Sequence, residues 1–399
     1  MANFLPFLAV LPNTDLADQI VTLPFDGYSS KQKEHILASN PVSFLQVILD
    51  HNQEQDARRK RFLSFFKQGF LQKTDTPVFL VYRQHKNNAC YTGFIGLIPI
   101  GTDADYLAIK KHEATLVHKE ALLAEYLDNA NLNAEPALLT FNATPQSQEL
   151  LQTLTKPKPD FDISLPDFGQ HQLWLVNNPK HQAQIKAVFA DLPSLYIADG
   201  HHRISSSRRL ALQRFQQHNR TSAADQYFLA ACFPSNEAQI LPYHRFVKKV
   251  PSNFLDQLQL QFGSAATIQP ALFSNPNSNH WMLRIHHQWF QISFTPPLPL
   301  STLAADWLND HVLAPLLNMH DLSSDKNIGF VGGQLNESDL IQAQLTAAAD
   351  ALFVLPPVQF HQFFSMVNQG QLMPPKSTWF EPKLLSGFTM FDLADSITP

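Results

Sequence analysis

The clearest structural pattern in this chain is a hydrophobic run that leads through a polar turn into a helix. Residues 195–198 (Leu-Tyr-Ile-Ala) predict a buried strand, Asp199-Gly200 predicts a turn, and a helix is expected from about residue 202 to residue 217. A helix N-terminus presents unpaired backbone N–H groups and the positive end of the helix dipole. The turn therefore suits an anion such as a phosphate.

The side chains of this turn have matching chemistry. Arg203 lies in the first helical turn and can hold two phosphate oxygens, while Gly200 lets the backbone approach a ligand closely. Asp199 can bind Mg²⁺ or orient a histidine. The alternative is that Asp199 only caps the helix and that His201, His202 and Arg203 are exposed.

A second polar segment covers residues 110–115 (Lys-Lys-His-Glu-Ala-Thr) and enters a helix expected from about residue 114 to residue 129. Glu113 beside cationic groups can act as a general base toward a hydroxyl, and Lys119 can contact a phosphate. His112 and His118 are six residues apart and do not share a helical face, which excludes the zinc protease pattern. The alternative is a solvated helix start in which Glu113 favours the helix dipole.

A third candidate is the proline-rich segment 373–383 (Met-Pro-Pro-Lys-Ser-Thr-Trp-Phe-Glu-Pro-Lys). With Gly370 it approaches a P-loop, but Pro375 stands where the second glycine belongs and has no N–H to give to a phosphate. A Walker A motif is therefore excluded, and Gly370 is interpreted as an ordinary helix end. The loop still carries Lys376 and Lys383 in a stiff segment. The alternative is a rigid tail that packs its aromatic side chains onto the body.

Composition limits the class of protein. The chain has 399 residues, 44% of them hydrophobic, which is enough for a sizeable core and predicts two or three domains or one composite unit. A net charge of −5 provides no general positive field, so nucleic-acid binding is disfavoured. Two cysteines make neither a disulfide framework nor a metal site, which fits a reducing compartment. No signal peptide or membrane span is expected, and we predict a cytoplasmic protein.

The order of predicted elements favours an α+β fold. Strands are expected at residues 77–83 and 91–100, and helices at residues 179–190 and 338–348. Helices and strands are mixed without a regular βαβ alternation, so a doubly wound sheet is disfavoured.

Seven short motifs follow one another along the chain: Pro24-Phe25-Asp26; Asn40-Pro41 with Ser43-Phe44-Leu45; Tyr91-Thr92-Gly93; His112-Glu113 with Thr115; residues 198–203 (Ala-Asp-Gly-His-His-Arg); residues 241–245 (Leu-Pro-Tyr-His-Arg); and residues 373–383. In this order they resemble the bacterial and archaeal "domain of unknown function 1015" family, over about residues 6 to 392.

The resemblance implies a fold and a domain division. Members are often described as ParB-like, because the Asp-Gly-His-His-Arg segment is similar to that of ParB/sulfiredoxin-fold kinases that phosphorylate free serine. The implied architecture is a ParB/sulfiredoxin-like mixed α+β core over residues 1–235, which contains the Glu113 and Asp199 motifs, and an additional α+β C-terminal region over residues 236–399.

The resemblance and the local chemistry together assign the site residues. In those kinases an acidic residue of the upstream His-Glu segment is the base, which implies Glu113 here. Asp199 is implied as a second catalytic residue and as the Mg²⁺ ligand. The predicted nucleotide- and phosphate-binding set is Gly200, His201, His202, Arg203, Lys119, Lys376 and Lys383. The predicted substrate-binding set is His112, Thr115, Arg245 and Ser377.

The leading hypothesis is a Mg²⁺-dependent phosphotransferase that uses ATP or ADP to phosphorylate a small hydroxyl substrate, free L-serine. The alternative is a ParB-like nucleotide-binding regulator or partner-binding protein without metabolite turnover, in which binding depends on Arg203 and is indifferent to Glu113. A third possibility is an inactive relative kept for assembly, because Phe25 and Ile204 replace tyrosines that are commoner in the family.

Overall fold

The computed structural model describes residues 3–24, 27–49, 56–166, 168–218, 223–299, 301–322, 324–395 and 397. It contains two compact units: unit 1 is Met1–Ala238 with Pro382–Pro399, and unit 2 is Gln239–Glu381. The sequence placed a boundary at 235/236 and assigned everything after it to the C-terminal region. The structure differs for Pro382–Pro399, which belongs to unit 1 because a strand near the chain end pairs with strands of that unit.

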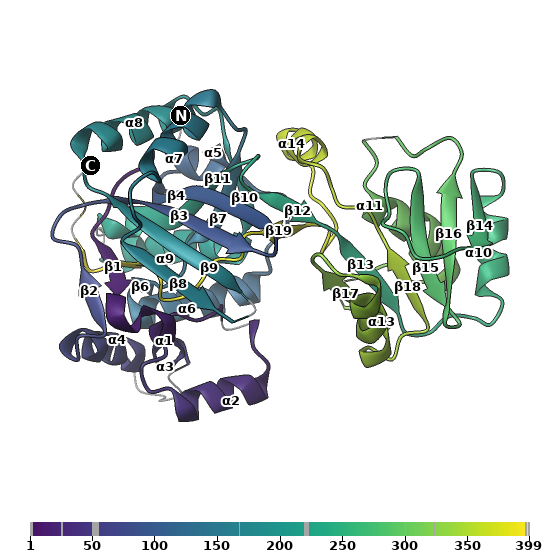
Figure 1. Ribbon diagram of the computed structural model, residues 1–399, viewed down its shortest axis with the longest axis horizontal. Coiled ribbons are helices and arrows are strands. Elements are labelled where there is room, and N and C mark those ends of the chain that lie inside the picture. Colours follow the sequence, from purple (N-terminus) through teal and green to yellow (C-terminus); the bar gives the residue numbers. More distant parts are fainter. Residues whose placement is uncertain are drawn as a thin grey trace. The chain divides into compact units, whose positions relative to one another are not determined.

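Unit 1 is built on an eight-stranded sheet (Figure 1). Its strands, in order across the sheet, are β5 (Ile109–Lys110), β10 (Leu195–Asp199), β7 (Ala137–Phe141), β11 (Tyr227–Pro234), β4 (Ala89–Pro99), β3 (Phe79–Lys86), β9 (Gly169–Val176) and β8 (Phe161–Leu165). The pairs β5–β10 and β7–β11 are parallel, and the other neighbours are antiparallel. The mixed sheet confirms the α+β class.

Helices α7 (Pro145–Leu154) and α8 (Pro179–Ala190) pack on one face of this sheet (Figure 1). Both begin with a capping side chain and a proline in the first turn, from Thr144-Pro145 and Asn178-Pro179. Phe189 of α8 stacks on Phe4 with ring centroids 3.9 Å apart, inside the main hydrophobic core of the unit. The helix predicted at residues 179–190 is confirmed.

A smaller sheet of unit 1 brings the chain end against the N-terminal region. Its strand order is β2 (Leu71–Lys73), β1 (Ala9–Pro12), β20 (Met390–Asp392) and β6 (Leu132–Asn133). This sheet has its own hydrophobic core, to which helices α3 (Leu45–Ile48) and α4 (Ala57–Lys67) contribute buried side chains. Asp392 forms ion pairs with Arg59 of α4 and Lys73 of β2. The remaining helical elements of this unit are η1 (Thr14–Leu16), α1 (Ala17–Ile20), α2 (Ser30–Ser39), α5 (Asp103–Ala108), α6 (Val117–Ala130), α9 (His201–His218) and η3 (Ala224–Gln226).

Unit 2 is built on a six-stranded antiparallel sheet. The order is β14 (Ala266–Pro270), β16 (Gln288–Phe294), β15 (His280–Ile285), β18 (Ala351–Val354), β13 (Tyr243–Val247) and β17 (Ile328–Gly332). One face packs on α10 (Phe254–Phe262), α11 (Ala304–Leu308), the π-helical turn η4 (Asn309–Leu313) and α12 (Ala314–Leu317). The other face packs on α13 (Glu337–Thr346).

The segments at either end of unit 2 pair with each other, β12 (Gln239–Leu241) with β19 (Trp379–Glu381). Helix α14 (Phe360–Asn368) precedes β19, and Gly370 just beyond it has a φ of +72°. A left-handed glycine after a helix is the usual way for a helix to end, so the interpretation of Gly370 as a helix end is confirmed. Among the residues that the structure describes, no helix is long and apolar enough to cross a membrane.

We predict that Gly387→Ala destabilises the protein strongly. Gly387 has a φ of +77°, and a Cβ built there would lie 2.6 Å from Cγ of buried Phe44. We expect a loss of about 2–5 kcal/mol in the free energy of unfolding, from left-handed strain and steric overlap together. The measurement is urea unfolding of the full chain.

Gly69→Ala is the matched control. Gly69 has a φ of +74° in the same unit, and an added Cβ would meet nothing within 4 Å. Only the backbone strain remains, about 1–2 kcal/mol. Equal losses in the two variants would contradict close packing of the Pro382–Pro399 segment against Phe44.

Candidate functional site

The predicted strand–turn–helix is present at β10 and α9. Asp199 ends β10, Gly200 has a φ of +96°, and α9 begins at His201. A β-bulge between Ile197 and Asp199 shifts the register with β7. Bulges of this kind redirect side chains near functional sites. The carboxyl end of β10 is therefore locally shaped to present Asp199 at the start of α9.

The glycine at position 200 makes room for a side chain of its own segment. A Cβ at Gly200 would lie 3.0 Å from Nε and 3.3 Å from Cζ of Arg203, and 3.2 Å from Cβ of Ala137. The guanidinium of Arg203 thus folds back over the turn. Gly200 is required both for its positive φ and for this close approach.

Asp199 lies between two cations. Nζ of Lys383 donates to Oδ2 of Asp199 at 2.9 Å, and Nη2 of Arg203 lies 3.8 Å from Oδ1. Burial alone would raise the pKa of the Asp199 carboxyl, but Lys383 and Arg203 outweigh it and hold that pKa well below its usual range. The side chain is 40% exposed, so an ionised carboxylate flanked by two cations faces solvent.

Arg203 is braced by a residue that the sequence motifs did not include. Nη1 of Arg203 donates to Oε1 of Glu135 and, at 2.8 Å, to the carbonyl oxygen of Pro136. The other oxygen of Glu135, Oε2, accepts a hydrogen bond from Oγ of Ser386 at 2.9 Å. Glu135 lies just before β7, and no motif in the sequence around it indicates this contact. Glu135 fixes the direction of Arg203 and ties it to the chain end.

His112 and His201 form a buried pair beneath the turn. Nδ1 of His112 donates to the carbonyl oxygen of Ile197 at 2.9 Å, and the backbone N–H of His112 donates to Nε2 of His201 at 3.4 Å. The two rings meet edge to face with centroids 4.5 Å apart. Burial lowers the pKa of His112 to about 4 and the pKa of His201 well below its usual value. Both rings are therefore neutral at pH 7 and connect β10 to the segment after β5.

Glu113 reaches the same edge of the sheet through the parallel register of β5 and β10. Lys110 lies opposite Tyr196, and His112 bonds to Ile197. The next residue, Glu113, therefore lies near the carboxyl end of β10, where Asp199 is. Glu113 and Thr115 are half-buried in the loop before α6. Helix α6 begins at Val117 rather than at residue 114, so the alternative in which Glu113 favours the first turn of a helix is wrong.

Lys119 contributes positive charge near the start of α9. Helices α6 and α9 pack along each other, and Lys119 is exposed in the first turn of α6. Burial lowers the pKa of His202, and the charge of Lys119 lowers it further. His202 is half-buried. Lys119 thus places a positive charge near His202, and Glu120 acts on the same ring in the opposite direction.

Three predicted residues belong to unit 2. Arg245 is fully buried in β13, Lys376 is exposed in the loop before β19, and Ser377 is buried with its hydroxyl bonded to the carbonyl oxygen of Pro374 at 2.8 Å. The contacts of unit 1 bring together Asp199, Arg203 and Lys383 without them. Their roles in binding phosphate or substrate stay predictions.

Phe25 and Ile204 stand where tyrosine was expected from the resemblance, and the structure describes only Ile204. Phe25 lies outside the described residues. Ile204 has no exposed surface and is part of the main core of unit 1, under the first turn of α9. A side chain at position 204 packs into the core and does not face the turn, so the replacement of tyrosine there removes no contact from the exposed side of the site.

The described residues contain no group of three or more His, Cys, Asp or Glu side chains arranged to hold a metal ion. Asp199 is the one predicted metal ligand, and Oδ2 of Asp199 already accepts from Lys383. Magnesium in nucleotide sites is often held by one or two carboxylates and by the phosphates of the substrate. Asp199 therefore fits a metal that arrives with a nucleotide, while its role as a ligand stays a prediction.

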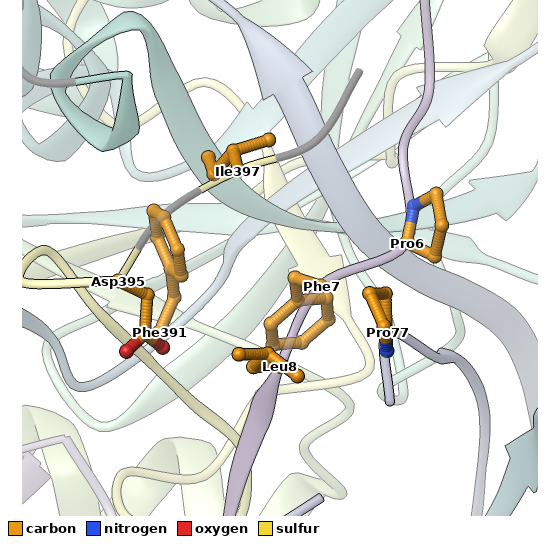
Figure 2. A pocket seen from close by; sticks show the side chains of 7 residues that line it. All are labelled: Pro6, Phe7, Leu8, Pro77, Phe391, Asp395 and Ile397. Atoms are coloured by element: carbon orange, nitrogen blue, oxygen red, sulfur yellow. The ribbon is translucent and has the colours of Figure 1, made fainter. Parts of the chain in front are cut away.

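Two small pockets lie elsewhere in unit 1. Figure 2 shows the first, where Phe7, Pro77 and Phe391 surround a space of about 10 Å³ next to Asp395. The second has a similar volume and is lined by Asn133, Ser207 and their neighbours. Each has room for about one water molecule. Neither pocket shares a residue with the site at β10, so neither is a candidate for a nucleotide.

We predict that His112 makes the protein less stable in acid. The folded pKa of about 4 lies below the unfolded value of 6.5, so the unfolded chain binds the proton more readily. Stability from this residue is complete above pH 6.5 and falls as the pH drops toward 4, by about 2–3 kcal/mol at pH 4.5. His112→Asn keeps a donor near the Ile197 carbonyl but cannot titrate.

The measurement is the free energy of unfolding of wild type and His112→Asn at pH 7.5 and pH 4.5. The difference between the two proteins at pH 7.5 gives the part of the free-energy loss that does not depend on pH. Between pH 7.5 and pH 4.5 the variant should lose less free energy of unfolding than wild type does. The same loss in both proteins would show that His112 is not buried in the neutral form.

Similar solved structures share low sequence identity with this chain. SbnI with a C-terminal truncation, from Staphylococcus aureus, is 12% identical with a TM-score of 0.40, covering 72% of this chain and 82% of its own. A free serine kinase mutant in complex with AMP is 12% identical with a TM-score of 0.37, covering 70% and 88%. A conserved hypothetical protein from Pyrococcus furiosus is 13% identical with a TM-score of 0.34, covering 69% and 90%. No curated protein matches the chain.

The sequence also matches a model of a protein family. The family is described as "Protein of unknown function (DUF1015)", and the match covers residues 4–318, which is most of the chain and includes both the Glu113 loop and the turn at Asp199. The motifs that suggested this family therefore lie within the matched region up to Arg245. The chain belongs to the DUF1015 family.

Proposed function

We propose that this chain is a phosphotransferase that transfers the terminal phosphoryl group of ATP or ADP to a small hydroxyl substrate, free L-serine. The observation that carries the proposal is the meeting of Asp199, Arg203 and Lys383 at the carboxyl end of β10, at the start of α9. Two cations and a helix N-terminus favour the phosphates of a nucleotide at this edge. We expect the loop that follows β5 to place the carboxylate of Glu113 toward the same edge.

The proposed reaction needs one base and several phosphate contacts. Glu113 accepts the proton of the substrate hydroxyl as its oxygen bonds to the terminal phosphorus. The bond between that phosphorus and the bridging oxygen breaks, and ATP leaves as ADP or ADP leaves as AMP. Lys383 and Arg203 stabilise the charge on the phosphate oxygens. Reactions of this kind depend mainly on positioning and electrostatics, and a general base contributes about 10²–10⁴-fold.

Magnesium enters the proposal as a companion of the nucleotide. Asp199 would be its protein ligand, because a carboxylate with a depressed pKa remains ionised and suits a hard cation. When bound, the ion would neutralise part of the phosphate charge. Lys383 would then exchange its bond to Asp199 for a phosphate oxygen. The exposure of both side chains, 30% and 40%, leaves room for that exchange.

The remaining predicted residues take supporting roles. Gly200, which has no side chain, leaves space for the guanidinium of Arg203 over the turn. His112 and His201 hold the loop of Glu113 against β10. Lys119 adds positive charge near the start of α9, and the lowered pKa of His202 leaves its ring neutral at pH 7, able to donate or accept a hydrogen bond. Thr115, Ser377 and Lys376 stay predicted contacts for substrate or phosphate.

We predict that Glu113→Gln abolishes turnover and leaves nucleotide binding intact. The amide keeps the size of the side chain but cannot accept a proton, so the rate should fall about 10²–10⁴-fold. The measurement is phosphoserine formation from L-serine and labelled nucleotide, together with the dissociation constant of the nucleotide from calorimetry. The matched control is Glu125→Gln, an exposed glutamate of α6, which should turn over like wild type.

The same comparison separates the kinase from the ParB-like regulator. In a regulator, nucleotide binding depends on Arg203 and its dissociation constant is unchanged by Glu113→Gln. Such a protein makes no phosphoserine. Unchanged phosphoserine formation by Glu113→Gln would remove Glu113 from the mechanism.

We predict that Lys383→Met weakens nucleotide binding. A charge-assisted contact to phosphate contributes about 1.5–3 kcal/mol, which is ~10- to 100-fold in the dissociation constant. Lys158→Met, at an exposed lysine of the same unit, is the control and should bind like wild type. If Lys383→Met binds nucleotide as tightly as Lys158→Met, the phosphates do not lie at Lys383.

A further inference from the structure

Arg245 is a fully buried cation in the sheet of unit 2. It lies in β13 and has no exposed surface. Its guanidinium lies 4.9 Å from the ring centre of Phe330 on the neighbouring strand β17. Nη1 donates to the backbone carbonyl oxygens of Tyr243 at 3.0 Å and Lys376 at 2.9 Å. One end of the guanidinium is thus fixed by backbone and one face by an aromatic ring.

The other edge of the guanidinium has no hydrogen-bond partner. Nε and Nη2 of Arg245 are both buried and unbonded. These two nitrogens point the same way and form the side-on fork with which arginine binds both oxygens of a carboxylate. Burial lowers the pKa of Arg245 to about 10, which leaves it charged at neutral pH. Two unused donors on a buried cation are costly unless a ligand accepts from them.

Acidic side chains near Arg245 do not fill the fork. Asp306 on α11 is close enough to interact electrostatically with Arg245, yet no carboxylate of the described residues forms an ion pair with the guanidinium. Burial and the charge of Asp310 raise the pKa of Asp306 to about 6, against the opposing effect of Arg245. A tight internal ion pair would have lowered the pKa of Asp306 instead.

We propose that the Nε–Nη2 edge of Arg245 binds a small molecule through one carboxylate, at a site contained within unit 2. A carboxylate matches the fork in shape and balances a single buried positive charge. A phosphate dianion would need a second buried cation, and Lys376 is exposed with its ammonium 5.7 Å from the ring centre of Tyr243. Tyr243, Phe330 and Asp306, which lie near Arg245, are each half-buried.

This site does not depend on phosphoryl transfer. Its residues come from β13, β17, α11 and the loop before β19, and Glu113 and Asp199 take no part. A protein that makes no phosphoserine can still bind a carboxylate at Arg245, and the reverse also holds.

The test is a titration of the full chain with sodium acetate, followed through the ¹⁵N–¹H resonances of the arginine Nε groups. The Nε resonance that is missing from the spectrum of Arg245→Lys is assigned to Arg245. We expect acetate to shift this signal with saturation, while sodium chloride at equal ionic strength leaves it unchanged. Inorganic phosphate should shift it at least tenfold more weakly. No saturable shift, or a stronger response to phosphate, would overturn the proposal.

Arg284 is the matched control in the same unit. It is 7% exposed in β15, and its Nη1 donates to Oε1 of Gln344 at 2.6 Å. The Arg284 Nε signal should not follow acetate, and an equal shift at Arg284 would mean a general anion effect. Acetate should also raise the melting temperature of wild type and of Arg284→Lys, but not of Arg245→Lys. In Glu113→Gln the acetate response should remain, which separates this site from the transferase proposal.

Discussion

The ion pair between Lys383 and Asp199 joins the end of the chain to the strand that carries the candidate site. Beyond Lys383, the hydroxyl of Ser386 bonds to Glu135, and the backbone N–H of Gly387 bonds to the carbonyl oxygen of Ala134. The chain then forms β20, which lies between β1 and β6 in the smaller sheet. One short segment thus completes that sheet, supplies a cation to Asp199 and supports the acid that braces Arg203. The site exists in this form only because the chain returns to unit 1 after unit 2.

The charges of the site are better suited to binding than to stability. Lys383 and Asp199 are 30% and 40% exposed, and ion pairs this exposed contribute about 1 kcal/mol or less. Their bond can therefore be exchanged for a bond to phosphate at little cost to the fold. The positions of the two groups are held by other contacts, namely the β10 ladder for Asp199 and the packing of Gly387 on Phe44 for the segment of Lys383. A rigid scaffold that carries an exchangeable ion pair suits the phosphate site that we propose.

Local patterns in the sequence predicted the local structure of the site well. The alternation of apolar run, Asp-Gly and helix located β10, the turn and α9 within a residue or two, because turn chemistry and helix initiation are local properties. The segment of Pro375, where the sequence excluded a P-loop, follows helix α14 and precedes strand β19. The start of α6 was misplaced by about three residues, because Glu113 and Thr115 are held in a loop by the pairing of β5 with β10, a contact between distant segments.

Contacts between distant segments could not be predicted without the fold. Nothing near Glu135 in the sequence indicates that it holds Arg203, and nothing near Lys383 shows that it reaches Asp199. The histidines of the turn were predicted to contact a ligand, yet the ring of His201 is buried against His112. Residue types suggested the chemistry that we propose, and the return of the chain to unit 1 decides which side chains lie together.

The most direct test of the central claim is ³¹P NMR of the full chain with L-serine, Mg²⁺ and either ATP or ADP. We predict that the phosphomonoester signal of phosphoserine appears as the terminal phosphate signal of the donor decreases, in wild type and not in Glu113→Gln. A donor that remains unchanged with both nucleotides, or one that yields only inorganic phosphate, would contradict it.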